Sequence, residues 1–203
     1  MNQLRPILLV ATAFAFTATS QAQTTPPVAA PGAKPAGAAA PGAPAQKPKP
    51  FSSSDTRAYL TVAESLQFQL NMSLRLRSRF KETEPQLVAF GSKLHKEATD
   101  LWTPGVDLAQ LHGVDGKKIP LDMTKADKAN VAKLNPIKDD KQWTLAYFEL
   151  FAKDSKKNAL EAEKTLKTVM DPELKAFLER AQALLKSQSE TVEAKFQELK
   201  VRK

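Results

Sequence analysis

The segment DPELKAFLERAQALLKSQSETVEAKFQEL, residues 171–199, has a clear helical pattern. Asp171 can cap a helix, Pro172 is tolerated in a first turn, and Glu173 complements the positive end of the helix dipole. Apolar residues then recur every three or four positions, as they do on the buried face of a helix: Leu174, Phe177, Leu178, Ala181, Leu184, Leu185, Val192 and Phe196. We therefore predict a helix from Asp171 to about Leu199.

The residues before this segment predict another long helix, from about Asp140 to Val169. Its inner side has the same three- and four-residue spacing of apolar residues: Trp143, Tyr147, Leu150, Phe151, Ala159, Ala162 and Leu166. Only a few residues separate the two helices. They should therefore pack against each other as an antiparallel hairpin.

Two further helices are predicted nearer the N-terminus. The first runs from about Asp55 to Phe80, after the cap-competent serines 52–54. The second opens at a capping box, with Thr83 as the cap and Gln86 as its partner, and Pro104-Gly105 is expected to end it. The short break between them predicts a second antiparallel hairpin.

Residues 103–139 form a long connection between the two hairpins. We expect a short helix near residues 108–111 closed by Gly113, and another that starts at a Thr124 capping box and ends near Leu134. Three apolar residues should anchor the connection to the core: Ile119, Leu121 and Met123. Two hairpins joined by one long crossover are the connectivity of ferritin-like four-helix bundles. We therefore predict an all-α, ferritin-like four-helix bundle over residues 51–203.

Residues 1–22 have the pattern of a cleaved signal peptide. Arg5 provides the positive charge, Ile7–Ala18 form a short apolar run, and small residues precede a cut after about Ala22. The apolar run is shorter than the roughly 20 residues of a spanning helix. We therefore expect a periplasmic or secreted protein with no transmembrane segment after cleavage.

Residues 23–50 consist mostly of Pro, Ala, Gly and Thr. A segment with so few apolar side chains cannot offset the entropy lost on folding, so a disordered, extended linker is predicted. One interpretation is a tether that holds the domain away from a surface. The other is a leader without a role of its own.

The charge of the chain narrows the classes of partner. The formal net charge is +8, but residues 51–203 hold 26 basic and 22 acidic residues, a net charge of +4. This mixed surface lacks the concentrated basic face of a nucleic-acid-binding protein, although it would favour an anionic partner. The chain has no cysteine, which excludes disulfides, thiolate catalysis and thiolate metal sites.

Two motifs resemble the exported bacterial family known as domain of unknown function 4142. The first is Asp171-Pro172-Glu173-Leu174-Lys175-Ala176-Phe177, which is similar to the start of the family's last helix. The second is the series Trp143, Tyr147, Phe151 and Ser155, which is similar to a Phe-x-x-x-Tyr-x-x-x-Met-x-x-x-His pattern. The resemblance covers about Asp55 to Leu199 and implies an exported protein with a ferritin-like helical fold.

The chain departs from that family at four positions where the family commonly has ligand-type residues. Gln69 stands in place of a glutamate, and Ala98 in place of the histidine of an Asp-His pair. Ser155 and Gln188 stand in place of two more histidines. The resemblance therefore implies that these are interior polar positions of a degraded metal site.

The ligands that a metal site requires show why these four departures matter. A di-iron or di-manganese site in such a bundle uses glutamates and Glu-x-x-His motifs, and this chain contains no Glu-x-x-His. The remaining candidate ligands are His95, Glu97 and Asp154, which would have to form a relocated site for iron, manganese or zinc. His112, before Gly113, is interpreted as an exposed cap residue.

We therefore expect a non-enzymatic, exported helical bundle without a cofactor, with a binding or scaffolding role in the cell envelope. The alternative is a metal-binding or redox-active ferritin-like protein that uses the relocated ligands. A third hypothesis is a module that binds an anionic component of the envelope. For this third hypothesis, the candidate residues lie at the end of the first helix: Arg75, Arg77, Arg79 and Lys81. The other interpretation of these four residues is a solvated helix end.

Overall fold

The computed structural model describes residues 48–201, and the predicted signal peptide and nearly all of the predicted linker lie outside this range. The described part contains helices and no strand, which confirms the all-α class. Its elements are α1 (Ser53–Arg79), α2 (Pro85–Leu111), the 3-10 helix η1 (Gly116–Lys118), α3 (Lys125–Ala132), α4 (Asp140–Leu166) and α5 (Pro172–Val201).

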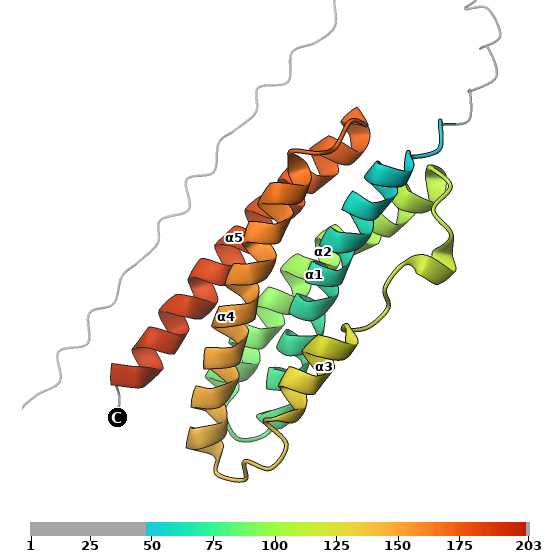
Figure 1. The fold of residues 1–203 in the computed structure, drawn as a ribbon. Helices are drawn as coiled ribbons and strands as arrows, with labels where there is room; N and C mark the ends of the chain where they lie inside the picture. The colour runs from blue at the N-terminus through green and yellow to red at the C-terminus, as the bar shows by residue number, and fades with distance from the viewer. Residues whose placement is uncertain (1–47, 202–203) are drawn as a thin grey trace, which may run out of the picture. The chain divides into compact units, whose positions relative to one another are not determined.

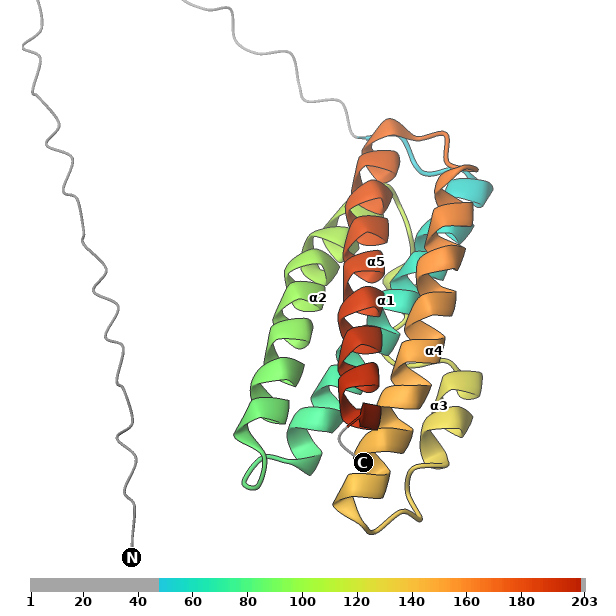
Figure 2. The ribbon, with the colours of Figure 1, turned by 90° about the vertical axis from the view of Figure 1, so that its left-hand side faces the viewer.

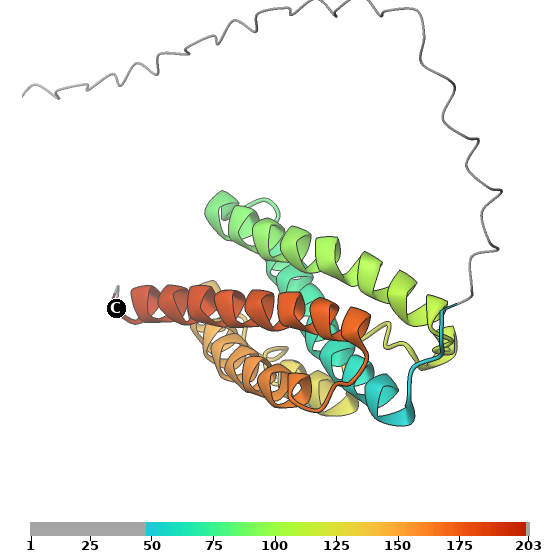
Figure 3. The ribbon, with the colours of Figure 1, turned by 90° about the horizontal axis from the view of Figure 1, so that it is seen from above.

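The four long helices form two hairpins that pack side by side (Figure 1). α1 pairs with α2, α4 pairs with α5, and the partners in each pair run in opposite directions. The crossover from α2 to α4 returns along the bundle and contains η1 and α3 (Figure 1), and Figure 2 shows α3 beside the start of α4. Seen from above, α2 and α4 lie on opposite sides of the bundle, with α1 and α5 between them (Figure 3).

Local capping signals set most of the helix starts. The side chains of Ser52, Thr124 and Asp139 each accept a hydrogen bond from a backbone N–H in the first turn of α1, α3 and α4. Asp171 accepts from the N–H groups of Glu173 and Leu174 at the start of α5, as predicted. These bonds satisfy backbone donors that have no partner inside the helix.

The predicted capping box at the start of α2 is wrong. The residue before the helix is Glu84, whose side chain makes no capping bond, and Pro85 takes the first helical position. Proline there has no N–H to satisfy, and its backbone angle already suits a helix. The chain therefore starts α2 without the Thr83–Gln86 pair.

The predicted stop at Pro104-Gly105 is also wrong, because α2 continues through both residues to Leu111. Pro104 removes one helical hydrogen bond, but Gly105 lies directly against the ring of Phe177 on α5. The Pro104-Gly105 segment is thus part of the contact between α2 and α5. The chain leaves the helix at Gly113, which has a positive φ of 81°.

One predicted anchor of the crossover is wrong. Ile119 is buried, whereas Leu121 is 81% exposed. The three anchors would share a side only in an extended strand, and the chain bends near Leu121 on its way to α3. Asp122 then pairs with Lys128 of α3 at 2.6 Å.

The core consists of two apolar clusters, one toward each end of the bundle. The cluster at the end where α1 begins includes Val62, Leu66 and Phe177. The cluster at the other end is rich in aromatic rings, among them Phe68, Trp143, Tyr147 and Phe151. Burial of these side chains drives the four helices together.

Gly105→Ala is expected to destabilise the protein by about 1–3 kcal/mol, because a Cβ there would lie 2.5 Å from Cζ of the buried Phe177 ring. Helix propensity alone predicts that Gly105→Ala stabilises the protein, since alanine is favoured over glycine in a helix by about 1 kcal/mol. Urea unfolding measures the difference. Gly116→Ala is the control, because the nearest side-chain atom there is 3.5 Å away. A Gly105→Ala variant as stable as the wild type would contradict this packing.

Candidate functional site

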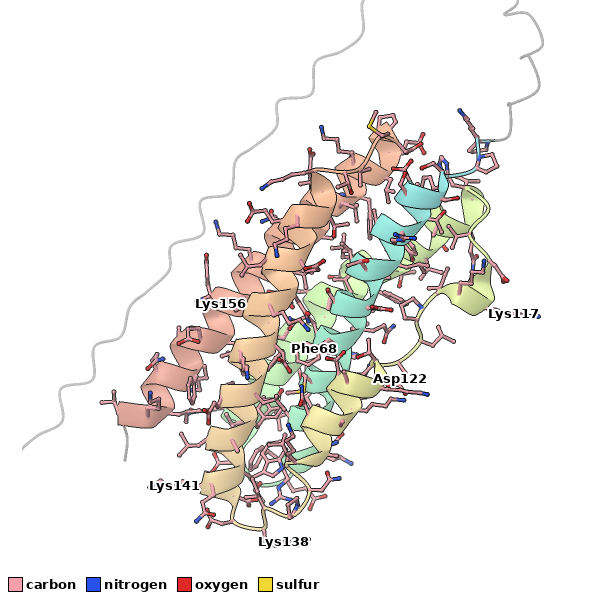
Figure 4. All side chains as sticks on the ribbon, in the orientation of Figure 1. Phe68, Lys117, Asp122, Lys138, Lys141 and Lys156 are labelled. Carbon is pink, nitrogen blue, oxygen red and sulfur yellow. The ribbon has the colours of Figure 1, made fainter. Side chains whose placement is uncertain are left out.

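A layer of polar side chains lies across the middle of the bundle, between the two apolar clusters. Its central members are Gln69 of α1, Ser155 of α4 and Gln188 of α5, each no more than 1% exposed. Ala98 of α2, the fourth position of the predicted site, is also fully buried. Phe68, labelled in Figure 4, precedes Gln69 and belongs to the aromatic cluster. We call Gln69, Ala98, Ser155 and Gln188 the mid-bundle layer.

Half of the mid-bundle layer is joined by a side-chain hydrogen bond between α1 and α4. Gln69 Nε2 donates to Ser155 Oγ at 2.9 Å, and both groups are inaccessible to solvent. The two residues are 86 positions apart in the sequence. This bond therefore links the first hairpin to the second.

The other half of the layer joins α5 to α2. Gln188 Nε2 donates to the backbone carbonyl of Leu94 at 3.1 Å and to Glu97 Oε2 at 3.2 Å. Leu94 is one turn before Ala98 on α2. The carboxylate of Glu97 thus contacts an amide of the layer, at the junction of α2 and α5.

The layer also contains polar atoms without a partner. Gln69 Oε1 and Gln188 Oε1 accept no hydrogen bond within residues 48–201, although both are fully buried. An unpaired buried acceptor lowers stability by about 1–3 kcal/mol. The layer is therefore costly, and its benefit is the pairing of particular helices at a particular level.

His95 lies on a different side of α2, at the junction with α1. Its Nδ1 is 3.3 Å from the carbonyl of Leu70 and 3.3 Å from Ser73 Oγ. Ser73 Oγ already donates to the Leu70 carbonyl at 2.9 Å, so Nδ1 is assigned as a donor that carries the proton. His95 thus contacts α1. It does not point toward Gln188 of α5, the residue that Glu97 contacts.

Asp154 lies on the side of α4 that α3 covers. Asp154 is 8% exposed, and its Oδ2 atom accepts no hydrogen bond in the described range. Burial raises the pKa of Asp154, and the negative charge of Asp127 raises it further. Lys153, Lys157 and a hydrogen bond with Asn130 oppose this rise in pKa without cancelling it.

The structure does not bring the three candidate ligands together. His95 contacts α1, Glu97 contacts α5, and Asp154 faces α3. Within residues 48–201, no group of three histidine or carboxylate side chains is placed to hold a metal ion. His95 and Glu97 are two positions apart on one helix, which points their side chains in different directions.

The interpretation of His112 as an exposed cap is wrong. His112 does follow α2 as its C-cap, but it is only 4% exposed. Its ring stacks on Phe51, and its two nitrogens bond to Lys49 and Glu173. All three partners are about 60 residues away in sequence, so no local pattern could have indicated the burial.

The basic end of α1 is also more structured than the sequence suggested. Arg79 pairs with Asp140 at 2.6 Å, donates to the Lys138 carbonyl, and covers the ring of Trp143. Arg75 donates to the side chain of Asn135. Two of the four basic residues therefore tie α1 to the crossover and α4, and are not simply solvated.

A groove of about 790 Å³ runs along the outer side of the α4–α5 hairpin. The half-exposed Leu160 is part of its apolar lining. Charged residues of both signs surround it in equal number: Lys156, Lys167, Lys186, Glu163, Glu190 and Glu193. Its charge therefore favours neither an anionic nor a cationic ligand.

The described chain is thus an all-helical bundle domain with two hairpins and a polar layer across its middle. None of its helices is long and apolar enough to cross a membrane, as far as residues 48–201 show. The family model described as "Domain of unknown function (DUF4142)" matches residues 40–194. Because this match covers most of the chain, the protein belongs to that family, which confirms the resemblance seen in the two motifs. No curated protein and no solved structure matches the chain.

Ser155→Ala is expected to destabilise the bundle by about 1–3 kcal/mol, because it leaves the buried Gln69 amide without a partner. The double variant Gln69→Leu/Ser155→Ala removes both partners and the unpaired Gln69 oxygen, so it should recover the wild-type stability or exceed it. Urea unfolding gives both free energies. Ser187→Ala, at an exposed position, is the control. A double variant at least as destabilised as Ser155→Ala would contradict this account.

Proposed function

We propose that this protein is an exported, non-enzymatic helical module that binds or scaffolds a component of the cell envelope. The observation that carries the proposal is the mid-bundle layer, in which the amides pair with a hydroxyl, a backbone carbonyl and one carboxylate. In this proposal the middle of the bundle serves to align helices. The signal-peptide pattern of residues 1–22 supports export.

The same proposal treats the fold as ferritin-like with a degraded metal site. The two hairpins and the single long crossover agree with that connectivity. A carboxylate-bridged pair of iron or manganese ions needs several anionic oxygens and imidazoles that converge. The layer offers two amides, a hydroxyl and the nearby Glu97 carboxylate, with His95 on another side of α2. These residues do not fit such a metal centre.

The placement of the basic residues supports a binding role for one end of the domain. The chain enters the described domain beside the end of α2, and the connection from α1 to α2 is at the opposite end (Figure 1). Two segments at that far end, residues 75–84 and 133–141, carry more basic than acidic side chains: Arg75, Arg77, Arg79, Lys81, Lys133, Lys138 and Lys141 against Glu82, Glu84, Asp139 and Asp140. A linker attached at one end would present this surface to an anionic envelope component.

Metal loading tests the first part of the proposal. After exposure to iron, manganese and zinc, the purified protein is expected to retain less than one equivalent of each metal and to keep its melting temperature. A metal bound at 100 times its dissociation constant would stabilise the fold by about 2.7 kcal/mol, which a melting curve detects. Elemental analysis and thermal unfolding are the two measurements.

Stoichiometric metal with a raised melting temperature would contradict the proposal. It would favour the alternative, a metal-binding or redox-active protein with relocated ligands. His95→Ala/Glu97→Ala and Asp154→Ala then distinguish the ligands. The variant that loses the metal without unfolding identifies the side chains that bind it.

Cosedimentation tests the second part. The protein is expected to pellet with vesicles that contain phosphatidylglycerol, and with purified cell-wall fragments, at low salt. It should stay in solution at about 1 M salt, where charges are screened beyond about 3 Å. Lys138→Glu/Lys141→Glu reverses two exposed charges at the basic end and should reduce the pelleted fraction (Figure 4).

Lys117→Glu/Lys156→Glu is the matched control, because it makes the same change of charge away from that end (Figure 4). An equal loss of pelleting in both variants would show that net charge, and not the basic end, governs binding. Absence of pelleting of the wild type at low salt would contradict an anionic partner.

A further inference from the structure

His112 holds the segment through which the chain enters the bundle. The ring of Phe51 stacks on the His112 ring, with centroids 4.3 Å apart and planes 14° from parallel. The Phe51 N–H also donates to the His112 carbonyl at 3.0 Å. We call residues Lys49–Phe51 the entry strap. It binds at the end of α2, where Glu173 of the first turn of α5 bonds to the same His112 ring.

Both nitrogens of the His112 ring face hydrogen-bond acceptors. Nδ1 is 2.7 Å from the backbone carbonyl of Lys49, and Nε2 is 2.9 Å from Glu173 Oε2. A carbonyl and an ionised carboxylate only accept, so each bond needs a proton on the histidine nitrogen. Neutral imidazole carries one N–H, and imidazolium carries two. The complete geometry therefore requires the charged ring.

We propose that protonated His112 is a pH-sensitive clamp that fastens the entry strap to the bundle, and that loss of its proton loosens the strap. The charged ring joins three segments, namely the strap, the end of α2 and the start of α5. The neutral ring can keep the bond to Lys49 or the bond to Glu173 as a donor, but not both. Stacking of Phe51 would then hold the strap with one hydrogen bond fewer.

The surroundings of the ring favour its charged form. Glu173 faces it from α5, and Asp171 faces it from the connection between α4 and α5. On the strap, the uncharged groups that face the ring are the Lys49 carbonyl and the Phe51 ring. Beside the strap, Asp115 and Lys118 line the shallow groove next to Phe51 and carry opposite charges.

The direction of the pKa shift agrees with the geometry. Burial by itself would lower the pKa of His112, but the bonds to Glu173 and Lys49, with the charges of Asp171 and Glu173, outweigh it and raise the pKa above 6.5. A group whose pKa is raised on folding stabilises the folded state below its unfolded pKa. That stabilisation is lost as the pH rises through the folded pKa. The clamp is therefore closed at mildly acidic pH and opens on the alkaline side of 6.5.

A pH titration of the full chain by NMR tests the clamp. The His112 ring should titrate above pH 6.5, and His95→Ala assigns which ring signal belongs to which histidine. Hydrogen exchange of the Phe51 amide, corrected for its intrinsic pH dependence, reports release of the strap. Its protection factor should fall about tenfold across the His112 titration, as expected for loss of one charge-assisted hydrogen bond.

Glu173→Gln keeps the shape of the side chain and removes its charge. It should lower the His112 pKa and move the Phe51 transition to lower pH by the same amount. Glu163→Gln is the matched control, since Glu163 of α4 pairs with Lys167, the residue after that helix, and does not contact His112. This control should leave both transitions unchanged.

Three outcomes would overturn the clamp. The first is a His112 ring that titrates at or below pH 6.5. The second is a Phe51 protection factor without a transition at the His112 titration. The third is a loss of Phe51 protection that coincides with loss at Val62, an amide in the core, because that would report unfolding of the whole bundle.

Discussion

The structure depends on the burial of α1, which packs against α2, α4 and α5. A helix covered on so many sides cannot keep all its polar groups in water, and a buried polar group without a partner is costly. α1 nevertheless contains buried Asp55, Gln69 and Ser73. Each of these side chains bonds outside its own helix or to its backbone, and these bonds define how α1 sits among its neighbours.

Asp55 shows how such a pairing stabilises one end of the bundle. Its carboxylate accepts bonds from the Met170 N–H and the Ser52 hydroxyl. Burial by itself would raise the pKa of Asp55, but these bonds and further backbone bonds lower it. The folded state therefore favours the ionised carboxylate. This carboxylate connects the start of α1 to the turn between α4 and α5.

The mid-bundle layer is the corresponding feature at the centre. Burial of the two apolar clusters is not directional, so it specifies the level of one hairpin against the other less strictly than a hydrogen bond does. The bond from Gln69 to Ser155 and the bond from Gln188 to the Leu94 carbonyl each relate one helix of the first hairpin to one of the second. In the proposed function this alignment is the purpose of the layer, and binding belongs to the surface.

The sequence by itself determined the features that depend on neighbouring residues. Helix starts at Ser52, Thr124 and Asp171 follow from side chains that cap the next turn, and apolar spacing showed four long helices in two hairpins. The last-helix motif at Asp171 also indicated the family. These signals are local, because a cap and a helical face are formed within a few turns of one chain segment.

Only the tertiary structure decided the features that need residues far apart in the sequence. α2 passes through Pro104 with Gly105 packed against Phe177 of α5, and His112 is buried because Lys49, Phe51 and Glu173 surround it. The same holds for the separation of His95, Glu97 and Asp154. A side chain's partners depend on which helices pack beside it, and helical periodicity describes one helix at a time.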